Sequence, residues 1–182
     1  MTMLVFALLT NSFHIIPWYI PPSSEANIER TVSKQSIKIY HANILSRNKN
    51  YLVFFEQINE EKPDILLLQE INTDWKAKLE ELGNVYPYRK IIARPDNFGI
   101  AILSKFPINN LAVSDWGHVG LPSILARINV GEGEFTLAYT HPLPPVNQHY
   151  FMLRNLQLSD MVKELQTLNE PLVVAGDFNL SM

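Results

Sequence analysis

Residues 172–179 read LVVAGDFN, an apolar run that leads directly into a Gly-Asp-x-Asn turn. The run predicts a buried strand, and the turn places a carboxylate and an amide just beyond its carboxyl end. In α/β proteins, ligands bind at the carboxyl ends of strands, because the strand is rigid and the loop after it is free to vary. Asp177 and Asn179 are therefore predicted site residues, suited to a hard cation or a phosphate oxygen.

The composition is that of a globular domain with a sizeable core. The chain has 182 residues, and its apolar fraction of 47% excludes a disordered protein. The net charge is −3 and no run of Lys or Arg stands out, so the sequence gives no strong evidence for a nucleic-acid partner. The chain has no cysteine, which excludes disulfides and thiolate metal ligands.

Residues 1–20 differ from the rest of the chain, because they contain no Asp, Glu, Lys or Arg. Their length is close to the span of about 20 apolar residues that crosses a membrane, and Trp18 and Tyr19 suit the membrane interface. We expect this segment to be a membrane anchor, cut short at its start. The alternative is an apolar strand or helix that packs on the domain. The polar composition of residues 21–35 predicts a linker, and residues 36–182 are predicted to form a folded domain.

Strands alternate with helices from residue 36 onward. Apolar patterns predict strands over residues 37–43, 65–68, 88–93 and 99–103, and a final strand from residue 172. Residues 124–130 and 135–140 flank Gly131-Glu132-Gly133, which predicts a hairpin. Helical periodicity predicts helices over residues 48–62, 73–82 and 146–168. Thr73 is the expected cap of the second. The mixture predicts an α/β fold built around a mixed sheet.

Polar side chains end the predicted strands. Asn43 ends the first, Glu70 the second, His141 follows the hairpin, and Asp177 and Asn179 follow the last strand. Singly, each has an ordinary explanation as a turn former, a solvated strand end or a satisfied histidine. Because all of them follow strands at their carboxyl ends, we expect them to converge at one edge of the sheet.

The chemistry of these side chains suits phosphate-ester cleavage. The Glu70 carboxylate can hold Mg²⁺ or Mn²⁺, because hard cations prefer carboxylate oxygens and water. Asn43, His141 and Asn179 can donate hydrogen bonds to phosphate oxygens as negative charge develops. Asp177 can hold the metal or position the attacking water.

The motifs, taken in order, resemble those of the endonuclease/exonuclease/phosphatase superfamily, which includes DNase I-like nucleases, sphingomyelinases and inositol polyphosphate 5-phosphatases. They are Asn43 after a strand, PDILLLQE at 63–70, GIAILS at 99–104, Thr140-His141 and GDFN at 176–179. The resemblance implies a four-layer α/β/β/α sandwich that is incomplete at its C-terminus, with residues 36–182 as its N-terminal two-thirds.

The resemblance also implies roles for the polar residues. Glu70 would be the metal ligand, with Asn43 beside the metal and the phosphate. His141 would contact the phosphate, and Asp177 and Asn179 would orient the water and the transition state. The hydrophobic N-terminus resembles that of a bacterial membrane-associated branch, which implies a location at the bacterial cell envelope, with the cytoplasm as the alternative.

Departures from the family pattern leave two further interpretations open. The family ends its domain with Ser-Asp-His, and no such motif follows Asn179; His14, His41, His118 and His149 stand in other contexts. Leu45 occupies a position where some family nucleases carry an acidic residue. Arg154 is expected to form a structural ion pair rather than to act in catalysis. The chain is thus expected to be a fragment of a phosphoesterase or an inactive phosphate- or partner-binding module; a plain α/β scaffold without a site is the third interpretation.

Overall fold

The computed structural model describes residues 10, 12–13, 36–131 and 133–180. The chain divides into two compact units, Met1–Gln35 and Ser36–Met182. The expected anchor and linker lie outside the described residues, apart from positions 10, 12 and 13. Within the described part, no helix is both long enough and apolar enough to span a membrane.

The second unit contains two sheets of four strands each. The first sheet has the order β1 (Ile39–Asn43), β2 (Ile65–Gln69), β4 (Ile100–Ser104), β3 (Tyr88–Ile92). The second has the order β5 (Ile108–Ser114), β6 (Ser123–Asn129), β7 (Glu134–Tyr139), β8 (Leu172–Ala175). The helices are α2 (Tyr51–Glu61), α3 (Thr73–Glu80) and α4 (Gln148–Leu165), with short 3₁₀ turns η2 (Glu81–Asn84) and η3 (Trp116–His118). The predicted mixed α/β class is confirmed.

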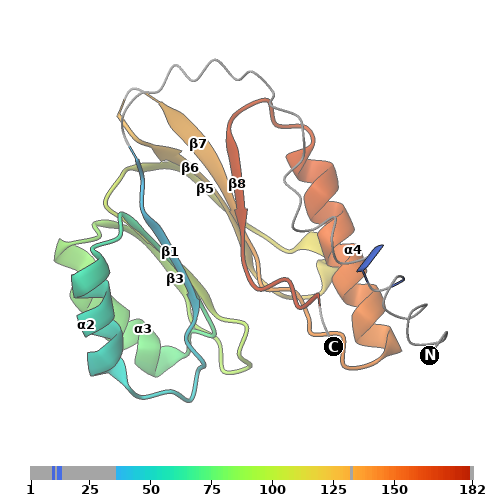
Figure 1. Ribbon diagram of the computed structural model, residues 1–182, viewed down its shortest axis with the longest axis horizontal. Helices are drawn as coiled ribbons and strands as arrows, with labels where there is room; N and C mark the ends of the chain where they lie inside the picture. The colour runs from blue at the N-terminus through green and yellow to red at the C-terminus, as the bar shows by residue number, and fades with distance from the viewer. Residues whose placement is uncertain (1–9, 11, 14–35, 132, 181–182) are drawn as a thin grey trace. The chain divides into compact units, whose positions relative to one another are not determined.

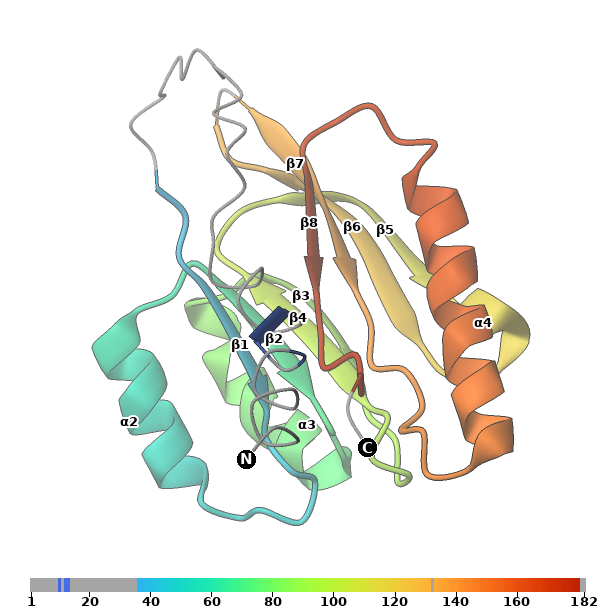
Figure 2. The same cartoon turned by 45° about the vertical axis from the view of Figure 1, so that its right-hand side comes forward.

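Both sheets combine parallel and antiparallel pairing, as expected. β1 runs parallel to β2, and β7 runs parallel to β8, while the other pairs are antiparallel. The first sheet and the second sheet face each other, with α2 and α3 outside the first and α4 outside the second (Figure 1). Figure 2 shows β1 and β8 running in the same direction toward one end of the unit.

Three hydrophobic clusters hold these layers together. Alternate residues of β2 face opposite ways, because side chains alternate along a strand. Leu66 and Leu68 pack with α2 and α3, whereas Ile65 and Leu67 pack between the two sheets against β6 and β7. On the outside of the second sheet, Ala138 packs against α4. The helix, sheet, sheet, helix order therefore follows from apolar residues on both faces of each sheet.

Several element boundaries differ from the sequence predictions. The helix expected from residue 48 starts at Tyr51, because the Asn48 side chain accepts a hydrogen bond from the backbone N–H of Asn50 and forms a turn. Asn72, rather than Thr73, caps α3 by accepting from the backbone N–H of Trp75. Strand β5 was not predicted, because its polar residues hide the strand pattern.

Candidate active site

The two parallel strand pairs end at a common polar edge of the fold. Asn43 is the register partner of Gln69 at the end of β1 and β2, and Glu70 follows directly. Tyr139 is the register partner of Ala175 at the end of β7 and β8. The chain then reaches His141 after β7 and Asp177 after β8.

The first sheet contributes a hydrogen-bonded pair to this edge. Asn43 Nδ2 donates to Glu70 Oε1 at 2.8 Å, and the backbone N–H of Leu45 donates to Asn43 Oδ1 at 3.1 Å. The second carboxylate oxygen of Glu70 accepts from the backbone N–H of Ser46 at 3.3 Å. These contacts fix the orientation of the Asn43 amide and hold a half-buried carboxylate beside it.

Residues with a strained backbone conformation also occur at this polar edge. Glu70 has φ 62°, in the left-handed region that residues other than Gly, Asn and Asp rarely adopt. Leu45, beside Asn43, has φ 59°. Such conformations cost about 1–3 kcal/mol each and persist where the surrounding structure enforces them, often at active sites. The strain therefore supports a functional interpretation of this edge.

His141 is the buried group of the site. Its side chain is 5% exposed, and the Phe98 ring lies 5.3 Å from the imidazole, centroid to centroid. Burial lowers the pKa of His141 from its ordinary value, and the nearby Asp177 and Glu70 carboxylates partly oppose that shift. His141 Nδ1 is buried and has no hydrogen-bond partner among the described residues. A buried ring nitrogen without a partner is uncommon in folded proteins, which marks His141 as a candidate functional residue.

The turn after β8 is held from three sides. The backbone N–H of Asn179 donates to Asp177 Oδ1 at 3.0 Å, and Asn179 Nδ2 donates to the carbonyl of Pro142 at 2.8 Å. Arg154 Nη1 donates to the Asn179 carbonyl at 2.6 Å. The prediction of an ion pair for Arg154 is wrong. Its buried guanidinium instead donates to neutral oxygens of Asn179 and Asn155, and it pairs with no carboxylate among the described residues.

Gln69, which was not among the predicted site residues, lies between the two halves of the edge. This residue is fully buried, and its carboxamide contacts Thr140 and Asp177 of the second sheet. His41, which stands outside any family motif, also reaches the edge, with Nε2 3.2 Å from Gln69 Oε1. A glutamine after four apolar residues of a buried strand was the available signal.

The predicted site residues thus lie in one linked arrangement. Hydrogen bonds join Asn43 to Glu70 and Asp177 to Asn179, and Gln69 connects the two pairs across the sheets. His141 lies within electrostatic reach of both Glu70 and Asp177. The catalytic and metal-binding roles assigned to these residues stay predictions.

Oxygen atoms dominate the possible metal ligands at this edge. Among the described residues, no three His, Asp or Glu side chains are grouped as a multi-ligand metal centre would need. Mg²⁺ needs fewer protein ligands, since it usually binds through one or two carboxylates and keeps several waters. Glu70, with Asn43 hydrogen-bonded to it, fits such a hydrated hard cation better than a closed site of zinc type.

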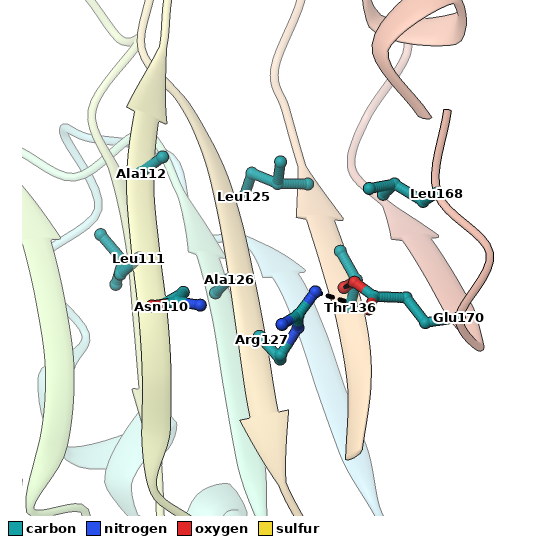
Figure 3. Close-up of a pocket in the computed structure, with 9 residues that line it drawn as sticks. All are labelled: Asn110, Leu111, Ala112, Leu125, Ala126, Arg127, Thr136, Leu168 and Glu170. Carbon is teal, nitrogen blue, oxygen red and sulfur yellow. Dashed lines mark hydrogen bonds and ion pairs between the residues drawn. The ribbon is translucent and has the colours of Figure 1, made fainter. Parts of the chain in front are cut away.

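A separate pocket lies away from the polar edge, on β5, β6 and the segment before β8 (Figure 3). Within it, Arg127 Nη2 donates to Glu170 Oε2 at 2.6 Å, and Thr136 also donates to the Glu170 carboxylate. None of the predicted site residues lines this pocket. Its ion pair secures the chain segment before β8 on the second sheet, which is a structural role.

Solved structures with the same fold are known. A truncated TDP2 from Caenorhabditis elegans has a TM-score of 0.66 and 21% identity, covering 80% of this chain and 63% of that one. The catalytic domain of human Nocturnin with bound sulfate has a TM-score of 0.66 and 23% identity, with 80% and 65% covered. A β-hairpin deletion mutant of β toxin from Staphylococcus aureus has a TM-score of 0.61 and 16% identity, with 80% and 68% covered.

These likenesses establish the DNase I-like fold, and the chain spans 63% of the length of the nematode structure. No curated protein matches the chain significantly. The sequence profile described as the Endonuclease/Exonuclease/phosphatase family matches residues 37–182, which includes every residue of the polar edge. The chain therefore belongs to the endonuclease/exonuclease/phosphatase family.

Proposed function

We propose that this chain is part of a phosphoesterase that depends on Mg²⁺ or Mn²⁺ and hydrolyses a phosphodiester or phosphomonoester by direct attack of water. The observation that carries the proposal is His141: a buried imidazole whose Nδ1 has no hydrogen-bond partner among the described residues, within electrostatic reach of the Asp177 and Glu70 carboxylates. Family membership supports phosphoric-ester chemistry for such a site. The 63% coverage of the nematode TDP2 structure supports a longer parent protein.

Each residue has a distinct part in the proposed reaction. Glu70 binds the cation, and Asn43, already hydrogen-bonded to it, orients the carboxylate and the phosphate. His141 donates its ring N–H to a phosphate oxygen as negative charge builds up. The Asp177 carboxylate is oriented by the Asn179 N–H. It accepts a proton from the attacking water and keeps that water in line with the phosphorus. A bound Mg²⁺ supplies electrostatic stabilisation of the charge that develops on the phosphate.

The substrate class is open between small phosphate esters and nucleic acids. One family structure is of Danio rerio TDP2 complexed with a single-strand DNA product. The net charge of −3 of this chain argues against a long contact with a duplex backbone. We therefore favour a short or single-stranded phosphate ester as the substrate, and assays should include a single-stranded oligonucleotide beside bis(p-nitrophenyl) phosphate.

The test uses the full-length protein that contains this chain. Hydrolysis of bis(p-nitrophenyl) phosphate should require Mg²⁺ or Mn²⁺, and Glu70→Gln should abolish it while the thermal unfolding curve stays two-state. Glu60→Gln is the matched control, because that exposed carboxylate lies on α2 away from the edge. Wild-type turnover in the Glu70→Gln variant would remove Glu70 from the mechanism. A well-folded parent that binds a phosphate ester without hydrolysing it would instead support a binding module.

We further propose that residues 1–20 place the domain at a membrane of the bacterial cell envelope. The support is the absence of charged residues from this segment. Full-length protein should float with lipid vesicles in a density gradient, and protein lacking residues 1–20 should stay at the bottom. Equal flotation of both would refute the anchor.

A further inference from the structure

Gln69 is the polar residue of a buried strand whose other residues are isoleucine and leucine. It ends the strand Ile-Leu-Leu-Leu-Gln of β2, and all five residues of that strand are buried. A buried amide without partners is destabilising, because it gives up its hydrogen bonds to water. A glutamine at this buried position therefore needs hydrogen-bond partners, and these partners indicate what the residue does.

The Gln69 carboxamide joins the two sheets by hydrogen bonds in both directions. Its Nε2 donates to the carbonyl of Thr140 at 2.8 Å, and its Oε1 accepts from the backbone N–H of Asp177 at 3.1 Å. The same oxygen lies 3.2 Å from Nε2 of His41, which can donate to it in the matching tautomer. One side chain at the end of β2 thus connects β1 with the segments that follow β7 and β8.

Close packing makes this contact specific. A Cβ at Gly176 would lie 3.3 Å from Gln69 Nε2 and 1.9 Å from the Thr140 carbonyl oxygen, so only glycine lets the β8 turn approach this closely. Two of these partners adjoin or belong to groups of the proposed mechanism: Thr140 precedes His141, and the N–H donor is the backbone of Asp177 itself. Gln69, in turn, precedes Glu70.

We propose that Gln69 is a positioning residue that sets the separation of Glu70, on the first sheet, from His141 and Asp177, on the second. This inference rests on the proposed phosphoesterase function. The hydrophobic contacts between the sheets are nondirectional and tolerate small sliding movements, whereas two oppositely directed hydrogen bonds from one planar amide define a register. A displacement of about 1 Å at a reacting centre can lower the rate about 10²-fold.

The first test is Gln69→Met in the full-length protein, which keeps an unbranched side chain of similar length and removes both hydrogen bonds. We expect kcat to fall about 10- to 100-fold, with KM changed much less, because the substrate is still bound but its reacting groups are misaligned. The matched control is Ile128→Ala. Ile128 belongs to the same cluster between the sheets but pairs with Phe135, at the opposite end of β7 from His141. This control should lower the melting temperature and leave kcat unchanged.

The second test is Gln69→Asn, which keeps the amide and adds no charge beside Glu70 and Asp177. Its side chain is one methylene shorter, so the amide is withdrawn from both the Thr140 carbonyl and the Asp177 N–H. A side chain needed only for its polarity would tolerate this change, whereas a positioning residue would not. We expect kcat to fall as in Gln69→Met, with KM close to the wild-type value.

The outcomes separate the two proposals. A wild-type protein without hydrolytic activity overturns the proposed function and this inference with it. An active wild type whose Gln69→Met variant keeps its kcat overturns the positioning role alone. If Gln69→Met does not fold, Gln69→Asn decides: a wild-type kcat overturns the inference, and a fall of about 10- to 100-fold with little change in KM supports it.

Discussion

Gly176→Ala should damage the protein far more than an ordinary loop substitution, because two constraints meet at this residue. Gly176 has φ 144°, a conformation that L-residues rarely adopt. An added Cβ would also lie 1.9 Å from the Thr140 carbonyl oxygen, well inside the 3.4 Å at which ordinary contact begins. The β8 turn and the end of β7 would therefore have to separate by more than an ångström.

The magnitude follows from these two effects. The backbone conformation costs about 1–3 kcal/mol for a residue with a Cβ, and forced backbone shifts in a packed region cost about 1–3 kcal/mol. The expected loss in the free energy of unfolding is thus about 2–6 kcal/mol, a large part of the 5–15 kcal/mol that is typical of a domain. The same separation displaces His141, so activity should fall by about 10²-fold.

Gly120→Ala is the matched control for the conformational part. Gly120 also has a positive φ, 76°, but an added Cβ there meets nothing within 4 Å. It should cost only about 1–2 kcal/mol, the usual difference between left- and right-handed backbone for an L-residue. Urea denaturation followed by tryptophan fluorescence measures both variants. Equal losses of stability, or a fully active Gly176→Ala protein, would refute the close approach at the polar edge.

Two further predictions concern the isolated chain and its response to pH. The 182-residue chain alone should self-associate in size-exclusion chromatography, since Leu172 and Val174 are 38% and 41% exposed on β8. Elution as a monomer would contradict this expectation. Because burial lowers the pKa of His141, the unfolded state binds its proton at higher pH than the folded state. Stability should therefore be greatest above the ordinary histidine pKa and fall as pH drops toward the lower folded value, with a weaker slope in His141→Gln when both are followed by thermal melts. An unchanged slope in that variant would mean that His141 binds its proton equally well in the folded and unfolded states, and that burial does not lower its pKa.

The polar edge could be predicted from the sequence because its residues follow strands. Asn43, Glu70, His141 and Asp177 each come directly after a run with the periodicity of a buried strand, and the carboxyl ends of such strands are where α/β folds place ligands. The ordered motifs then indicated the family, which the match over residues 37–182 confirms. Local patterns were sufficient here, because each depends on residues adjacent in the chain.

Contacts between distant residues could not be predicted in this way. Gln69 and Asp177 are 108 positions apart, and only the facing of the two sheets shows that the Gln69 carboxamide binds the Asp177 backbone. Likewise, Arg154 binds the Asn179 carbonyl instead of a carboxylate, because the turn after β8 comes against α4. The amino-acid sequence alone determined which side chains end the strands. The tertiary structure decided how far apart the two halves of the site lie, because that distance depends on packing between sheets, which no local sequence pattern encodes.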